Sequence, residues 1–151
     1  MTNNSSRIVQ IVQSGSMTLV QDRGRFGFQE LGVSVSGAVD IDSLDLGNLL
    51  VGNDPDAACL EVLLGGLEIE FFDDAVIAVT GAESDVTIDG VPISLGVSYF
   101  VHSDARIELG IATSGLRTYI AIAGGIDIPQ TLGSRSTHFA SKIGGVDGRS
   151  D

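Results

Sequence analysis

Residues 59–79 read CLEVLLGGLEIEFFDDAVIAV, and this stretch has the pattern of a chain built from short strands. Apolar runs at Leu60–Leu64 and Leu67–Phe71 flank Gly65-Gly66, which predicts two strands joined as a hairpin. Glutamates alternate with apolar residues in the second run, so one of its faces meets water. Ala75–Val79 is apolar on both faces and is predicted to be a central strand.

Short apolar runs between glycines extend over most of the chain. Val86–Ile88 and Val91–Ile93 enclose Asp89-Gly90, a dipeptide that favours the tight turn of a β-hairpin. A strand pair is predicted around Ser14-Gly15. The two strands of that pair are Arg7–Gln13 and Met17–Val20. The remaining predicted strands are Val97–Val101, Arg106–Ile111 and Tyr119–Ala123.

The segment from Asp40 to Val51 has the apolar spacing of a helix, with Asp40 able to cap its start and Gly52 able to end it. A second short helix is predicted from Thr137 to Ile143. About nine short strands with one or two short helices predict a mainly β fold, a barrel or closed sandwich, because closure removes exposed sheet edges. We expect residues 1–151 to form a single β-rich domain.

The composition excludes several classes of protein. The chain has 151 residues, 43% of them hydrophobic, and a formal net charge of −12. The hydrophobic content excludes a disordered chain, and the negative charge argues against nucleic acid and anionic membrane surfaces as partners. We find neither a secretory signal nor the roughly 20 apolar residues of a membrane span, so we expect a cytoplasmic protein. Two histidines and one cysteine, Cys59, have no metal-ligand spacing, and no metal site is expected.

The first candidate site is the loop that begins at Gln21 and reads QDRGRFGF. A guanidinium group binds a carboxylate through two parallel hydrogen bonds, so Arg25 is a candidate for holding a carboxylate-bearing ligand. The alternative is a simple turn, in which Asp22 pairs with Arg25 or with the rim of the barrel.

The second candidate is the sequence SGAVD at residues 36–40, directly before the predicted helix. Free main-chain N–H groups near Gly37 can bind an anion or polarise a carbonyl group. The alternative is plain capping of the helix by Asp40, whose carboxylate would deter a second anion.

Two polar residues lie among apolar ones. Glu61 shares a strand face with Cys59 and Leu63, which places it at the strand end or inside the barrel. A buried carboxylate needs a donor, because leaving it unpaired costs several kcal/mol or forces it to protonate. Asn48 lies on the partly apolar face of the predicted helix. The two groups either line one pocket or are structural groups that satisfy each other.

A fourth candidate lies at Gly133–His138, which reads GSRSTH. Arg135 offers a second guanidinium group for a carboxylate ligand. Ser136 and His138 lack the glycine pattern that surrounds the nucleophile of a hydrolytic triad. Capping of the following helix by the hydroxyl groups is the alternative.

These segments resemble a known family. Thr18–Gln29 reads TLVQDRGRFGFQ and Gly32–Asp40 reads GVSVSGAVD, and the pair resembles the biotin-dependent carboxyltransferase, or Kip antagonist, family. This family is also called allophanate hydrolase subunit 2-like and includes the C-type subunit of prokaryotic 5-oxoprolinase. The resemblance continues through Asn48–Asn53, Ala57–Glu61, Val79–Ala82, Ala121–Asp127, Leu132–Thr137 and Gly144–Arg149. Ser34 and Val39 depart from it, since the family commonly has Pro and Met there.

The resemblance implies a cyclophilin-like β-barrel, with this chain corresponding to the N-terminal half of the family. It implies a B-type partner, also called the Kip inhibitor-like protein, and a further, A-type partner. The assembled complex hydrolyses 5-oxoproline to glutamate with ATP. Relatives within urea carboxylase transfer carboxyl groups from carboxybiotin. The ligands are small amides or lactams. No cofactor is expected to bind this chain directly, because ATP or carboxybiotin is supplied through the partners.

The residues that match the family motifs define the expected site. Asp22 and Glu61 are the expected catalytic acids. The expected substrate-binding residues are Gln21, Arg25, Gly37, Asp40, Asn48, Arg135 and Ser136. In this hypothesis Arg25 or Arg135 holds a ligand carboxylate, one acid moves a proton, and amides near Gly37 polarise a carbonyl.

Three alternative functions remain open from the sequence. The chain can be a non-enzymatic module that sequesters a Kip inhibitor-like protein, a urea- or allophanate-type carboxyltransferase component, or an inactive structural fragment. It can also self-associate, because a half-length member would expose the apolar surface that its other half covers.

Overall fold

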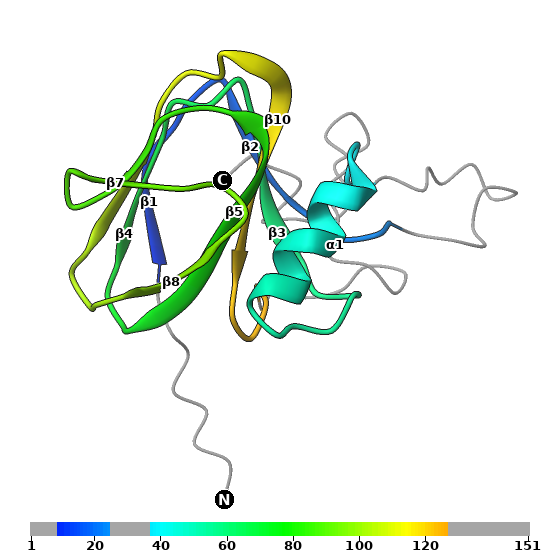
Figure 1. Ribbon diagram of the computed structural model, residues 1–151, viewed down its shortest axis with the longest axis horizontal. Coiled ribbons are helices and arrows are strands. Elements are labelled where there is room, and N and C mark those ends of the chain that lie inside the picture. Colours follow the sequence, from blue (N-terminus) through cyan, green and yellow to red (C-terminus); the bar gives the residue numbers. More distant parts are fainter. Residues whose placement is uncertain (1–8, 25–36, 127–151) are drawn as a thin grey trace, which may run out of the picture.

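The computed structural model describes residues 9–24 and 37–126. Within these ranges the chain forms ten strands and one helix (Figure 1). The elements are β1 Val9–Ser14, β2 Met17–Gln21, α1 Ile41–Leu50, β3 Cys59–Leu63, β4 Leu67–Phe71, β5 Ala75–Glu83, β6 Val86–Ile88, β7 Val91–Ile93, β8 Ser98–Val101, β9 Arg106–Leu109 and β10 Ser114–Ile122. The mainly β fold predicted from the sequence is confirmed. The second predicted helix, Thr137 to Ile143, lies outside the described residues.

The strands form two antiparallel sheets of five strands each. The first has the order β1-β4-β9-β6-β7 and the second the order β2-β3-β10-β5-β8. The hydrogen-bonded ladders of the described strands do not join the two sheets into the closed barrel expected from the sequence. The sheets instead face each other, as in a sandwich (Figure 1).

Two of the three predicted strand pairs are wrong, and glycines explain why. β1 and β2 belong to different sheets, and so do β3 and β4. The connections at Gly15 and at Gly65-Gly66 are therefore corners that carry the chain from one sheet to the other. At both Gly15 and Gly65 the main chain has a positive φ and lies against another main-chain segment, so a Cβ atom there would collide with a carbonyl oxygen.

The hairpin predicted at Asp89-Gly90 is confirmed. β6 pairs with β7 in antiparallel register, with Val86 opposite Ile93. Asp89 and Gly90 have φ values of 49° and 80°. Positive φ at both central residues is the conformation that a two-residue turn needs to match the twist of its strands.

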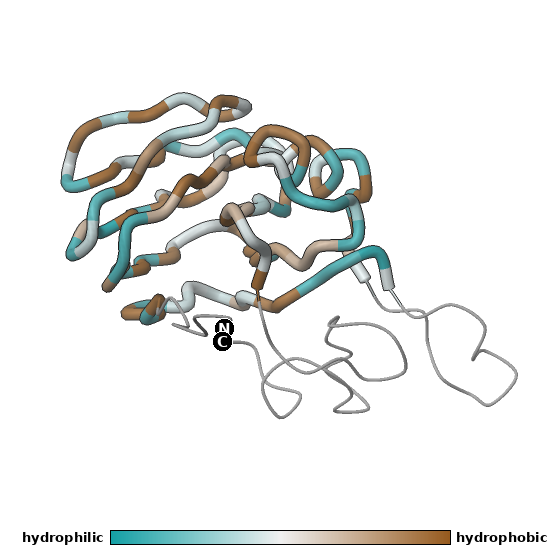
Figure 2. Tube along the Cα trace, turned by 90° about the horizontal axis from the view of Figure 1, so that it is seen from below, coloured by the Kyte–Doolittle hydropathy of each residue, from teal (hydrophilic) through white to brown (hydrophobic). Residues whose placement is uncertain are grey.

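The space between the two sheets holds the main hydrophobic core. The second sheet contributes alternate residues of its central strands, such as Leu60, Val62 and Ile120, and the first sheet contributes Ile69 and Ile107. Figure 2 shows apolar and polar residues interspersed along the strands. Each strand of the first sheet therefore turns one face to the core and the other to water.

The helix α1 covers the opposite face of the second sheet (Figure 1). Leu44 of the helix packs with Cys59, Tyr119 and Ala121 in a separate buried cluster. The described molecule thus has three layers, in the order first sheet, second sheet, helix. The helix is too short to cross a bilayer, and no other helix occurs in the described ranges.

The ends of α1 follow the sequence prediction. The Oδ1 atom of Asp40 accepts a hydrogen bond from the main-chain N–H of Ser43 at 3.1 Å, and its Oδ2 accepts one from the Ser43 hydroxyl at 2.6 Å. Gly52 follows the last turn with a φ of +75°. Both signals that predicted the helix bounds are therefore confirmed.

We predict that Gly65→Ala is much more destabilising than Gly90→Ala. The two glycines have φ values of +78° and +80°, but a Cβ atom meets main-chain atoms only at Gly65. Gly90→Ala should lower the free energy of unfolding by about 1 kcal/mol, through φ strain alone, and Gly65→Ala by about 3 kcal/mol. Urea unfolding measures both values, and equal losses would show that the corner tolerates a side chain.

Candidate functional site

Two of the sequence motifs meet at the helix start. The main-chain N–H of Ala38 donates a hydrogen bond to the carbonyl oxygen of Asp22 at 2.9 Å. Gly37 has a φ of +88°, and a Cβ atom there would lie 2.8 Å from the carbonyl group of Arg23 and from Gly24. Only glycine fits this close approach. The described parts of the loop motif and of the helix-start motif, residues 21–24 and 37–40, were predicted as separate candidates and are in contact; we call them together the helix-start unit.

Asp22 closes a turn within this unit. Its side chain is 5% exposed, and its Oδ1 atom accepts a hydrogen bond from the main-chain N–H of Gly24 at 2.8 Å. This is the Asx-turn that short acidic side chains form with their own main chain. Gln21, at the end of β2, is buried beside it and pairs in register with Cys59 of β3.

Glu61 lies in the layer between the second sheet and α1, with 5% of its surface exposed. The sequence placed it at a strand end or in the barrel interior. It instead faces the helix, because it shares its strand face with Cys59 of the helix-side cluster. The donor that a buried carboxylate requires is present. Its Oε2 atom accepts hydrogen bonds from the Tyr119 hydroxyl at 2.6 Å and from the main-chain N–H of Val39 at 3.0 Å.

Tyr119 is the central residue that the sequence analysis missed. It lies directly opposite Glu61 on β10, and its ring is fully buried. Its hydroxyl oxygen also accepts a hydrogen bond from the main-chain N–H of Asp40 at 2.9 Å. Burial, and then the hydrogen bond to Glu61, raises the pKa of Tyr119 well above its usual value, so the phenol stays protonated and acts as a donor. One tyrosine in an apolar strand signals a buried hydroxyl that needs a partner.

Three main-chain amides at the helix start already have acceptors within the chain. Ala38 donates to Asp22, Val39 to Glu61 and Asp40 to Tyr119. The sequence suggested that amides near Gly37 polarise a ligand carbonyl. These three groups are not available for that purpose, because each N–H can make one good hydrogen bond and is already used.

Asn48 has hydrogen-bond partners of its own among the described residues, and Glu61 is not one of them. Its Nδ2 atom donates to the carbonyl oxygen of Ala57 at 2.9 Å, and Asn53 donates to its Oδ1 atom at 3.4 Å. The Cys59 thiol also donates to that oxygen at 3.4 Å. Asn48 therefore joins the end of α1 to the start of β3.

Near the helix start, two arginines other than the expected ones approach acids. Arg117 Nε lies 3.8 Å from Oε1 of Glu61, and Arg23 pairs with Asp45 of α1 at 2.6 Å. The second pair is about 40% exposed on both sides and contributes little to stability. The three expected ligand-binding residues Arg25, Arg135 and Ser136 lie outside the described residues.

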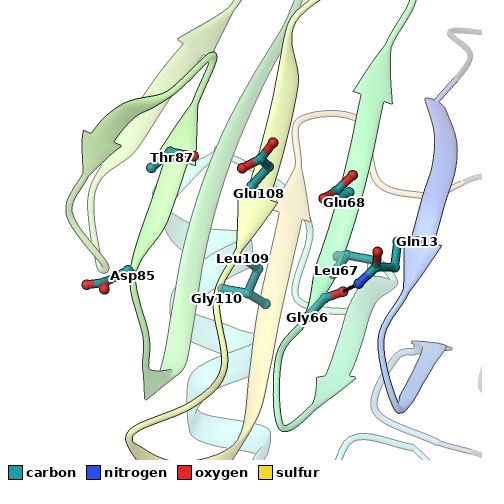
Figure 3. A pocket seen from close by; sticks show the side chains of 9 residues that line it. All are labelled: Gln13, Gly66, Leu67, Glu68, Asp85, Thr87, Glu108, Leu109 and Gly110. Carbon is teal, nitrogen blue, oxygen red and sulfur yellow. Dashed lines mark hydrogen bonds between the residues drawn. The ribbon is translucent and has the colours of Figure 1, made fainter.

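A separate hollow of about 300 Å³ lies on the outer face of the first sheet (Figure 3). Glu68 and Glu108 face each other across neighbouring strands in its wall, and Asp85 lies at its edge. None of the expected site residues in the described ranges lines this hollow. Within the same ranges no group of His, Cys, Asp or Glu side chains is arranged to hold a metal ion.

Comparisons with known proteins agree with the motifs at the helix start. A family model described as carboxyltransferase domain, subdomain A and B, matches residues 31–150. The chain belongs to the carboxyltransferase domain family. The C-type subunit of 5-oxoprolinase from Escherichia coli is 42% identical over 94% of the chain. Urea amidolyase from Saccharomyces cerevisiae is 40% identical over 93% of the chain.

Solved structures show the same carboxyltransferase fold. The crystal structure of the Kluyveromyces lactis urea carboxylase matches 95% of this chain with a TM-score of 0.93 and 37% identity, within 13% of its own length. The carboxyltransferase chain described here spans 46% of the Escherichia coli 5-oxoprolinase relative and 8% of the yeast urea amidolyase.

We predict that the only thiol of this carboxyltransferase chain is inert in the folded protein. Burial raises the pKa of Cys59 to about 12, so only about one thiol in 10⁴ is ionised at pH 8. A chromogenic disulfide reagent at pH 8 should release no colour in minutes from the native protein, and one equivalent in urea. Rapid stoichiometric labelling without denaturant would contradict the burial of Cys59.

Proposed function

We propose that this chain is a component of an ATP-dependent 5-oxoprolinase, which opens the lactam 5-oxoproline to glutamate. It would act with a B-type, or Kip inhibitor-like, partner and with an A-type partner, and ATP would enter through these two proteins. The observation that carries the proposal is the 42% identity with the C-type subunit of the Escherichia coli enzyme over 94% of this chain.

The helix-start unit supports a role next to a small ligand. It joins the two expected motifs through Gly37 and keeps Asp22 and Glu61 in fixed places. Arg25 follows Gly24 directly in the sequence, and we propose that it, with Arg135, holds the carboxylate of 5-oxoproline. Asp22 is the proposed acid for proton transfer, because it belongs to the same loop motif as Arg25.

We predict that activity in the reconstituted complex depends on these arginines. In a mixture with the A-type and B-type partners, Arg25→Ala and Arg135→Ala should each raise KM for 5-oxoproline by about 10- to 100-fold, the loss of a charged hydrogen bond. Glutamate release with ATP measures this effect. Arg106→Ala is the control, because Arg106 faces Glu68 and Glu70 on the first sheet at 3.7–3.9 Å, away from the site.

Glutamate release that is equally fast without this chain would overturn the proposed function. Full activity after both substitutions would leave the function standing and remove the arginines from the binding site.

A second candidate function is supported by the urea amidolyase and urea carboxylase relatives. In this case the chain contributes to carboxyl transfer from carboxybiotin to an amide such as urea.

We predict that the two functions differ in their response to avidin, which binds biotin. Transfer to urea should stop when avidin is added, whereas opening of 5-oxoproline should continue.

A further inference from the structure

One carboxylate oxygen of Glu61 already accepts two hydrogen bonds from the chain, which limits the proton transfers that this residue can carry out. Oε2 accepts the Tyr119 hydroxyl at 2.6 Å and the Val39 N–H at 3.0 Å, both inside the layer between the second sheet and α1. Its other oxygen faces Arg117 at 3.8 Å. A general base must reach the proton that it removes. The oxygen that lies inside this layer already accepts two hydrogen bonds from the chain itself, and the other lies closest to a cation, which favours the ionised carboxylate as a fixed acceptor.

We propose that Glu61 and Tyr119 are positioning residues that together hold Val39 and Asp40 in place, and that Glu61 does not exchange protons with the ligand. We call the hydrogen bonds of these four residues the Glu61–Tyr119 latch. The proposal rests on the proposed function, because holding Val39 and Asp40 matters for activity only if a ligand binds beside the helix start.

The latch holds two successive amides with two different acceptors. Val39 donates to Glu61, and Asp40 donates to the hydroxyl of Tyr119, which itself donates to Glu61. The phenol thus accepts from one main-chain group and donates to the carboxylate. Because both acceptors belong to neighbouring inner strands, β3 and β10, the segment is fixed to the middle of the second sheet.

The effect of the latch extends to the loop motif. The residue before Val39 donates to the carbonyl oxygen of Asp22, and Gly37 lies against Arg23 and Gly24 with no room for a side chain. A shift of Val39 would therefore displace the turn that Asp22 closes. Asp40 also caps α1, so the same latch sets where the helix begins.

The deciding variant is Tyr119→Phe, which keeps the buried ring and removes only the hydroxyl. Tyr99→Phe is the matched control, because the Tyr99 hydroxyl likewise accepts a main-chain N–H, that of Ser94 at 2.9 Å, at the far edge of the second sheet. In the chain alone, amide hydrogen exchange measured by NMR should become at least about tenfold faster at Val39 and Asp40 in Tyr119→Phe.

The Tyr99→Phe control should leave the exchange of Val39 and Asp40 unchanged. Amides in the centre of β10, such as that of Ile120, should keep their protection in both variants. Unchanged exchange at Val39 and Asp40 in Tyr119→Phe would overturn the latch, and so would an equal loss of protection throughout the sheet. This measurement needs no partner protein, and it decides the latch even if the chain has no 5-oxoprolinase role.

Kinetics of the reconstituted complex test the role of Glu61. A positioning role predicts that Glu61→Gln and Tyr119→Phe both raise KM for 5-oxoproline by about tenfold and leave both limbs of the pH profile of kcat in place. If Glu61→Gln instead lowers kcat by about 100-fold or more and removes one limb, Glu61 carries protons and the proposal is wrong. A wild-type complex that does not open 5-oxoproline would contradict the proposed function alone.

Discussion

The central strands of the second sheet carry buried, mostly apolar residues on both faces, so both faces of this sheet have to be covered. Leu60 and Ile120 point into the core between the sheets, whereas their neighbours Cys59 and Tyr119 point to the helix side. The first sheet covers one face and α1 the other. The described contacts of the candidate site depend on this helix, because they hold its start against the second sheet.

The carboxylate of Glu61 shows how that fixing is achieved. An apolar residue at this position would bury more hydrophobic surface, but it could not accept the N–H of Val39 or the hydroxyl of Tyr119. A buried carboxylate is tolerated because both donors are supplied by the fold, and Arg117 approaches from the rim. These polar groups give Val39 and Asp40 defined hydrogen-bond partners, which hydrophobic packing alone would not specify.

Local signals predicted local structure well. Asp89-Gly90 predicted a hairpin and Asp40 with Gly52 predicted the bounds of α1, because the cause in each case lies within a few residues. The hairpin predicted at Gly65-Gly66 is wrong, because a glycine pair indicates that the chain turns but not which sheet the next strand joins. That choice depends on the close approach of Gly65 to Gly110, which is distant in the sequence.

The same distinction applies to the site. The sequence indicated that Glu61 needs a donor, but the donor lies 58 residues away on β10. It also placed free amides at the helix start, where their acceptors come from β3, β10 and the loop before Gly24. Each of these contacts joins elements that only the assembled sheets bring together. The sequence therefore indicates which groups need hydrogen-bond partners, but it does not indicate which residues supply them.

The central place of β10 has a consequence for how the protein is made. This strand lies between β3 and β5, and both of these leave the ribosome before it. Until residues 114–122 have been synthesised, the two earlier strands lack their common neighbour and expose apolar edges, while β6 and β7 can pair at once. Pairing of such distant segments is slow, so the growing chain exposes these unpaired edges for longer than it exposes the β6–β7 hairpin.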